Sequence, residues 1–196
     1  MSVNARVLGI AERWIGTPYR HQGATRGVGC DCLGLVRGIW RELYGGEPEV
    51  VPAYAPDWAE RSGEERLLQA AGRHFSTVAS FEESRPGDLV LFRFRPGMAA
   101  KHAGILARMT ETDVKADAAS GDADLVGDHA GAGQLGLAMA RDAGPDGIWT
   151  RAADELCSAP DAFIHAYEQS AVTRSALVPG WKRKIAGIYR FPERDF

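Results

Sequence analysis

The sequence predicts an α+β fold in which helices come first and an antiparallel sheet follows. In the first part of the chain, apolar residues recur at three- and four-residue intervals, which is the period of a helix. From about residue 85 onward, short runs rich in aliphatic and aromatic residues stand between turn signals, which is typical of strands. Helices that precede the strands, rather than alternate with them, favour an antiparallel sheet.

Three helices are expected before the sheet. The first covers about residues 3–14, and the second begins near residues 31–32 and stops at the glycine pair 45–46. Three prolines fall within residues 47–57, so this stretch is expected to be an extended loop, because proline removes a backbone donor and fixes φ. A third helix is expected over residues 64–73, with its leucines and alanines facing inward.

Four strands are expected in the second part of the chain. Each begins or ends at a turn signal such as Pro-Gly, and each carries a run of apolar residues. They correspond to the stretches RPGDLVLFRF, KHAGILAR, AFIHAYE and KRKIAGIYRFP.

The region 109–160, between the second and third expected strands, has an unusual composition. It is rich in Ala, Gly and Asp, and holds ten acidic residues against three basic ones. A segment of this length inside a compact domain is expected to be a lid over a cleft, an arm that binds a partner, or partly disordered. We therefore interpret residues 1–196 as a single catalytic domain that carries an acidic insertion over 109–160.

Composition and charge exclude several classes of protein. The 196 residues carry a net charge of −3, which is not the basic footprint of a nucleic-acid-binding protein. No apolar run is long enough to span a membrane, and the N-terminus lacks the pattern of a signal peptide. With 3 cysteines, a disulfide framework is not expected. The sequence thus predicts a protein made in the cytoplasm.

Two of the cysteines stand two positions apart in the stretch GVGCDCLGL. Cys32 falls at the expected start of the second helix, where unpaired backbone N–H groups and the helix dipole favour a thiolate. Cys30 lies outside the helix and lacks this placement. Because the thiolate is the reactive form of cysteine, Cys32 is the candidate nucleophile. The alternative is that both are small buried residues, which is common for free cysteine.

A cysteine nucleophile also requires a base, and two histidines are candidates. His102 opens an expected strand, and His165 lies in the middle of another, so that both can face the end of the cysteine helix if the strands are neighbours. A histidine within a strand can equally be a core residue with satisfied hydrogen bonds. Residue types alone therefore leave the Cys–His–His interpretation open.

A metal site and a redox pair are rival interpretations of the same residues. Cys30, Cys32, His102 and His165 offer four ligands, but C-x-C is not the usual zinc spacing and the histidines are not closely paired in sequence. The C-x-C spacing also differs from the C-x-x-C of redox proteins. We therefore expect no metal and no cofactor.

Four motifs in order resemble the NlpC/P60 superfamily of cell-wall cysteine peptidases. They are GTPYRHQG, GCDCLGLVRGIW, RPGDLVLF and KHAGIL. The form GCDCLGL, together with FIHAY and WKRKIAG, is most similar to the tail-associated peptidases of phages and gene transfer agents. The resemblance covers about residues 5–108 and 161–192, and residues 109–160 have no counterpart in it.

The resemblance implies a papain-like NlpC/P60 fold and a role for five residues. It assigns Cys32 as the nucleophile, His102 as the general base and His165 as the residue that orients the base. It places Tyr19 in the lining of the active site, and makes Asp31 a structural or substrate-contacting neighbour. It also leaves Cys30 without a catalytic role.

The resemblance further implies a substrate and a setting. The expected reaction is hydrolysis of peptidoglycan stem peptides, at a γ-D-glutamyl bond to the diamino acid, through an acyl-enzyme. The expected setting is a phage-like particle tail acting in the periplasm, with other tail or baseplate proteins as partners. A catalytically silent tail subunit, and an amidase or acyltransferase of the same fold, are the alternatives. Leu33 stands where the superfamily has serine, so the substrate pocket is expected to differ.

Overall fold

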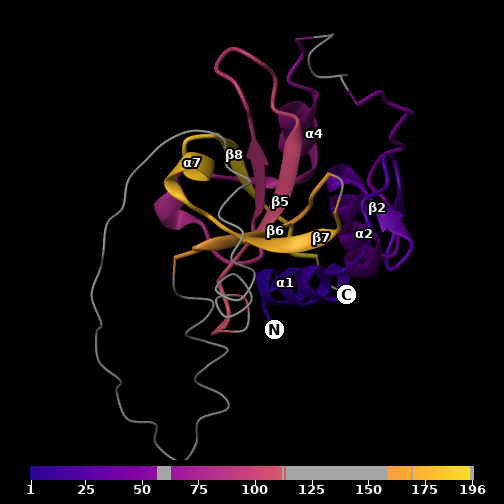
Figure 1. The fold of residues 1–196 in the computed structure, drawn as a ribbon, viewed down its shortest axis with the longest axis horizontal. Coiled ribbons are helices and arrows are strands. Elements are labelled where there is room, and N and C mark those ends of the chain that lie inside the picture. Colours follow the sequence, from indigo (N-terminus) through magenta and orange to yellow (C-terminus); the bar gives the residue numbers. More distant parts are fainter. Residues whose placement is uncertain (57–62, 112, 114–158, 169, 195–196) are drawn as a thin grey trace, which may run out of the picture.

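The computed structural model describes residues 1–56, 63–111, 113, 159–168 and 170–194 (Figure 1). Three longer helices come before the main sheet in the chain: α1 (Val3–Trp14), α2 (Cys32–Tyr44) and α4 (Arg66–His74). A short helix, α7 (Pro179–Lys182), and a single 3-10 turn, η1 (Phe81–Glu83), lie between strands. The helix boundaries predicted from the sequence are therefore correct to within two residues at each end.

The main sheet has six strands, and every pairing in it is antiparallel. Its spatial order is β3-β8-β4-β5-β6-β7. The strands are β3 (Ser76–Val78), β4 (Leu89–Phe92), β5 (His102–Ala107), β6 (Ala162–Ala166), β7 (Val172–Ala176) and β8 (Ile185–Arg190). A separate two-stranded ribbon pairs β1 (Ala24–Thr25) with β2 (Gly29–Cys30). The α+β class with an antiparallel sheet is confirmed.

The two strands of the main sheet that the sequence analysis missed are its edges, β3 and β7. Both are short and mostly polar on their accessible faces, so neither shows the apolar alternation that predicts a strand. Their pairing comes from the neighbouring strands, since β3 joins β8 and β7 joins β6 along its whole length. Tertiary context, rather than local sequence, forms these two edges.

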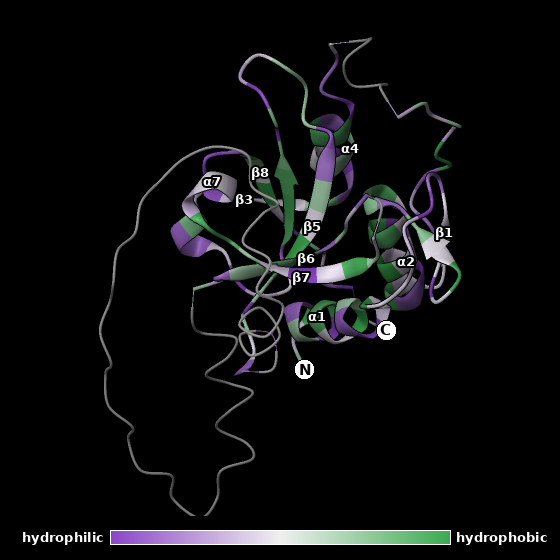
Figure 2. Ribbon diagram, in the orientation of Figure 1, coloured by the Kyte–Doolittle hydropathy of each residue, from purple (hydrophilic) through white to green (hydrophobic). Residues whose placement is uncertain are grey.

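The first face of the sheet packs against α1 and α2. Both helices carry hydrophobic and hydrophilic residues side by side, so that each has one apolar face to bury (Figure 2). Trp14 of α1 and Trp40 of α2 are buried there, as their helical spacing predicts. The sheet residues of this face come from alternate positions of the central strands, namely Leu89, Leu91, Ala103, Ile105, Ala107, Ala162, Ile164 and Ala166.

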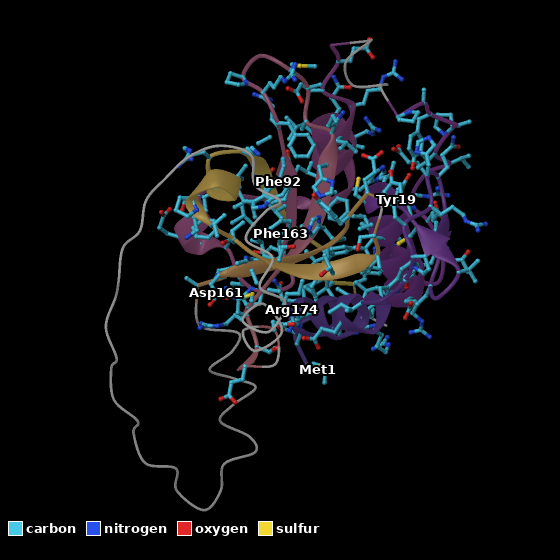
Figure 3. The ribbon with its side chains drawn as sticks, in the orientation of Figure 1. Met1, Tyr19, Phe92, Asp161, Phe163 and Arg174 are labelled. Carbon is cyan, nitrogen blue, oxygen red and sulfur yellow. The ribbon has the colours of Figure 1, made fainter. Side chains whose placement is uncertain are left out.

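The second face of the sheet is aromatic. Phe92 and Phe163 lie side by side at the centre of the fold, with ring centroids 5.0 Å apart (Figure 3). Trp181 of α7 packs on both rings from outside, at 5.0 Å and 4.9 Å. The remaining apolar residues of this cluster are Val90, Leu106, Leu177 and Ile188.

The region 109–160 leaves and rejoins the sheet at the end of β5 and the start of β6. Met109 donates its backbone N–H to Asp161 at 2.7 Å, which holds the two ends of the region together. His102 opens β5, so it lies at the other end of that strand, five residues or about 17 Å away. The expectation of a lid, an arm or disorder applies to residues 109–160, of which residues 112 and 114–158 lie outside the described part of the chain.

Candidate active site

The first turn of α2 positions Cys32. Asp31 caps this helix, since its side chain accepts from the Gly34 N–H at 2.7 Å, and the helix then begins at Cys32. A side chain at Gly34 would place its Cβ 1.8 Å from the Gly23 carbonyl oxygen, so the loop lies directly on this turn. The Cys32 sulfur is half-buried and lies 3.9 Å from the Lys101 carbonyl oxygen, one residue before His102. The predicted helix start is confirmed.

Asp31 is fully engaged in hydrogen bonds. Besides the Gly34 N–H, its carboxylate accepts from the backbone N–H of Gln22 at 2.7 Å and from the Tyr54 hydroxyl at 2.6 Å. These three donors come from the helix start, the preceding loop and the proline-rich loop. Asp31 is 3% exposed. Its carboxylate therefore ties three segments together around Cys32.

His102 and His165 contact each other across neighbouring strands. His102 Nε2 lies 2.8 Å from His165 Nδ1, and the two rings are nearly perpendicular. His165 Nε2 in turn lies 3.0 Å from the hydroxyl oxygen of Ser175 on β7. The structure thus brings together the two histidines that the sequence analysis singled out, and adds Ser175 behind them.

Gly104 provides the space for this contact. It shares a strand face with His102, and by the register of β5 with β6 it stands opposite His165. A Cβ at this position would lie 3.0 Å from Phe163 Cδ2, 3.1 Å from the Ile164 carbonyl oxygen and 3.4 Å from the His165 Cβ, so a side chain would crowd the strand that carries His165. The glycine in the stretch HAGIL therefore fits a position with little room for a side chain.

The histidines are held neutral by burial. The His102 ring lies within 6.0 Å of the Phe92, Phe94 and Trp181 rings. Burial, with a smaller contribution from the Lys101 ammonium, lowers the pKa of His102 to about 4. Burial, followed by the neighbouring His102, lowers the pKa of His165 to about 3. Both imidazoles are therefore uncharged at neutral pH.

The pKa of Cys32 differs from the sequence-based expectation. The helix start was expected to favour a thiolate, and backbone N–H groups of Ala103 and Leu33 do lower the pKa. Burial and the nearby Asp31 carboxylate outweigh them and raise the pKa of the thiol to about 12. The expectation of an ionised sulfur is therefore wrong for the free protein: the thiol and the imidazole are both neutral.

A cavity of about 150 Å³ opens over these groups. Its lining includes Cys32 and His102, together with Tyr19. Burial and nearby carboxylates raise the pKa of Tyr19 to about 12, so its hydroxyl keeps its proton and can donate. Further lining residues are His21, Asp31, Leu33, Tyr54, Pro56, Leu67, Lys101, Ala166, Tyr167, Glu168 and Trp181.

Cys30 lies apart from this cavity. It is 0% exposed in the core under α2, and burial raises the pKa of its thiol to about 12. The four-ligand metal interpretation requires Cys30 and Cys32 to join the two histidines. Over the described ranges, no group of three or more His, Cys, Asp and Glu side chains is placed to hold a metal ion.

Three residues of the site had no signal in the sequence. Tyr54 comes from the proline-rich loop and reaches Asp31, Trp181 comes from α7, and Ser175 comes from the edge strand β7. Each arrives through a contact between segments that are distant in the chain. Only a correct prediction of β7 next to β6 would have pointed to Ser175.

The fold and the site define a papain-like α+β protein with a cysteine at a helix start and a histidine on the adjoining sheet. A sequence model of the NlpC/P60 family matches residues 16–190, and the chain belongs to this family. No curated protein matches the chain significantly.

Solved structures of NlpC/P60 proteins resemble this chain at low identity. A Staphylococcus aureus protein described as similar to a lipoprotein of the NLP/P60 family has 16% identity and a TM-score of 0.49, over 98% of this chain and 42% of that one. NlpC1 from Trichomonas vaginalis has 14% identity and a TM-score of 0.46, over 96% and 44%. The NlpC/p60 domain of the peptidoglycan hydrolase SagA has 16% identity and a TM-score of 0.44, over 96% and 98%. This chain spans less than half of the first two proteins.

Across the part of the chain that the structure describes, no helix is both long and apolar enough to cross a membrane.

Proposed function

We propose that this protein is a cysteine peptidase that hydrolyses peptidoglycan stem peptides. Membership of the NlpC/P60 family supports this class of activity. The observation that carries the proposal is that Cys32 and His102 line one cavity while the far nitrogen of His102 is bonded to His165. A nucleophile, a base and a group that orients the base are the parts that acyl transfer requires.

The neutral thiol and imidazole define the first step. As the Cys32 sulfur attacks the scissile carbonyl, its proton passes to His102, and a tetrahedral oxyanion forms. The backbone N–H groups at the start of α2, together with the protonated Tyr19 hydroxyl, supply donors for this oxyanion. His102 then gives the proton to the departing amine, which leaves an acyl group on Cys32.

Water completes the reaction. His102, neutral again after the amine leaves, takes a proton from a water molecule as the water attacks the thioester. Collapse of the second tetrahedral intermediate breaks the C–S bond, and the proton returns from His102 to the sulfur. His165 holds the imidazole in one orientation throughout, and the aromatic face behind it limits the access of water.

The bond that we propose is the γ-D-glutamyl bond to the diamino acid. The proposal rests on the resemblance of the motifs to the superfamily. The cavity lining includes both Lys101 and Glu168, so it offers a group of each sign to a substrate that carries carboxylates and an amine. Leu33 and Leu67 add an apolar wall. We therefore expect the chain to prefer a different stem peptide from relatives that have serine at this position.

Digestion of purified muropeptides tests the proposal. Wild type and the Cys32→Ala variant are incubated with the same muropeptides, and the products are weighed by mass spectrometry. We expect wild type to release peptides cut after D-glutamate and Cys32→Ala to release none. Cys30→Ala, which removes the buried thiol, is the matched control and should cut as wild type does. Full turnover by Cys32→Ala would refute the assignment.

The same digestion separates the alternative activities. Products cut at the amide between sugar and peptide indicate an amidase, and peptides joined to an added amine indicate an acyltransferase. A folded wild-type protein that leaves every muropeptide intact indicates a silent structural subunit. We further propose that the protein acts in the periplasm from a phage-like tail, as the FIHAY and WKRKIAG motifs suggest. Its detection in purified particles would support this setting, and its absence from them would refute it.

A further inference from the structure

Ser175 lies at the inner end of a chain of hydrogen-bonding groups that begins at the cavity. His102 Nε2 and His165 Nδ1 are 2.8 Å apart, and His165 Nε2 and Ser175 Oγ are 3.0 Å apart. Ser175 pairs with Phe163 in the register of β7 with β6, so it stands diagonal to His165 on the same face of the sheet. The hydroxyl therefore reaches the one ring nitrogen of His165 that faces away from His102.

The proton positions along this chain are linked. A neutral imidazole carries one proton, so it donates through one nitrogen and accepts through the other. For His102 to accept a proton at Nδ1, its own proton must be on Nε2, where it is donated to His165 Nδ1. His165 must then carry its proton on Nε2, and this N–H needs an acceptor. In the opposite arrangement, His102 carries its proton on Nδ1 and cannot act as the base there.

Burial makes the acceptor at this point important. His165 is 1% exposed, and its ring is surrounded by Phe163 at 4.4 Å, Tyr167 at 5.7 Å and Trp181 at 5.9 Å. None of these three rings offers a strong acceptor to the imidazole N–H. An N–H left unpaired in such surroundings is unfavourable, so the position of the proton depends on Ser175. A serine hydroxyl can accept from this N–H, whereas in the opposite arrangement it would have to donate to a bare Nε2, so the direction of this hydrogen bond and the two tautomers are coupled.

We propose that Ser175 is a positioning residue that accepts from His165 Nε2–H and thereby keeps His102 in the tautomer that can take the proton of Cys32. The inference rests on the proposed function for its effect on rate. Its structural part, the tautomer of His165, does not depend on any activity. Ser175 itself touches neither the cavity nor the reacting atoms.

A set of variants at position 175 separates the hydroxyl from the shape of the side chain. Ser175→Thr keeps a hydroxyl, whereas Ser175→Val has nearly the same shape without one, and both are β-branched residues that suit a strand. Ser175→Ala removes the hydroxyl without adding bulk. Thr173→Val, on the same face of β7, is the control that removes a hydroxyl at a neighbouring position.

The rate measurement compares kcat and KM on a stem peptide that wild type cuts. We expect Ser175→Ala and Ser175→Val to lower kcat about tenfold with KM unchanged, because a disfavoured tautomer reduces the competent fraction of the enzyme. Ser175→Thr should recover most of the loss, and Thr173→Val should match wild type. Equal kcat in Ser175→Val and wild type would overturn the proposal for Ser175. The proposed peptidase activity is tested independently by Cys32→Ala.

Heteronuclear NMR of the histidine ring nitrogens provides the second measurement. In wild type we expect the His165 proton on Nε2 and the His102 proton also on Nε2. In Ser175→Val a substantial fraction of both should move to Nδ1, and Thr173→Val should leave them in place. A wild-type His165 protonated on Nδ1 would overturn the proposal. The tautomers can be measured even in a protein that cuts no peptide. Failure of the proposed peptidase activity can therefore be distinguished from failure of the proposal for Ser175.

Discussion

The two faces of the sheet contribute to the candidate site in different ways. Cys32 belongs to the face covered by α1 and α2, where it packs with Tyr19 and Leu33 against the larger apolar cluster. His102 and His165 belong to the aromatic face, against Phe92, Phe163 and Trp181. The two faces meet at the start of β5, where the Cys32 sulfur lies against the residue before His102.

The two faces differ in what holds the sulfur and the imidazoles in place. We call the face covered by α1 and α2 the helical face. On the helical face, a helix cap and a close backbone approach position the sulfur, and both depend on residues 22–34. On the aromatic face, side chains from β5, β6, β7 and α7 position the imidazoles. The helical face thus sets where the nucleophile is, and the aromatic face sets the charge and the orientation of the base.

Among substitutions on the aromatic face, removal of the base should lower the hydrolysis rate most. We expect His102→Ala to lower kcat by about 10²- to 10⁴-fold, because this change removes the group that is proposed to take the thiol proton. His165→Ala should lower it less, since His165 acts through His102. Hydrolysis rates of a stem peptide measure both. His74→Ala, at the end of α4, is the control. A His165→Ala loss larger than that of His102→Ala would reverse the proposed roles.

Local features of the two faces could be predicted from the sequence. The start of the helix at Cys32 is a local feature, so it was predicted from the sequence near residues 31–32. The Asp31 cap and the close approach at Gly34 became evident only in the structure. The two histidines were identified by strand position, because period-2 alternation predicts which face a residue occupies.

What the sequence could not predict depends on contacts between distant segments. Ser175 lies on an edge strand whose residues VTRSA have no strand signal, and its bond to His165 exists only because β7 pairs with β6. The pKa of Cys32 was predicted in the wrong direction for a similar reason. The helix dipole is a local feature, whereas the burial and the Asp31 charge that outweigh it follow from tertiary packing.

A larger side chain at position 104 tests whether the contact between His102 and His165 depends on the small size of Gly104. We expect Gly104→Val to lower kcat about 10-fold to 10²-fold, because the added methyl groups displace His165 or Phe163 and lengthen the contact with His102. The crowding should also lower the free energy of unfolding by about 1–3 kcal/mol.

Gly9→Ala is the matched control for this crowding. Gly9 lies in α1, where an added Cβ meets nothing within 4 Å. Its activity should equal that of wild type, and its stability should not fall. Unfolding by chemical denaturant and hydrolysis rates are measured on the same preparations. A fully active Gly104→Val would show that the two imidazoles do not need the close approach seen here.

The acidic limb of the pH profile tests the neutral state that the aromatic face imposes. Since the pKa of His102 is lowered to about 4, the base stays unprotonated well below the ordinary imidazole value. We therefore expect kcat/KM to remain nearly constant as the pH falls through about 6.5 and to decline only as it approaches about 4. A decline centred near about 6.5 would show that His102 is not desolvated in this way.

Folding must be followed over the same pH range. Below the ordinary imidazole value, His102 and His165 gain protons in the unfolded chain before they gain them in the folded protein, because their folded pKa values are lowered. The free energy of unfolding should therefore fall as the pH falls from about 6.5 toward about 4. Circular dichroism at each pH separates loss of fold from protonation of the base.

Substitution of Cys30 should have the smallest effect on the reaction and tests the helical face. The Cys30 side chain is 0% exposed and packs in the apolar cluster, so Cys30→Ser places a hydroxyl where the sulfur was buried. We expect the free energy of unfolding to fall by about 1–3 kcal/mol, with kcat per folded molecule unchanged. Denaturant unfolding and active-site titration measure the two quantities. Inactivity of a folded Cys30→Ser protein would mean that position 30, two residues before Cys32, takes part in the chemistry.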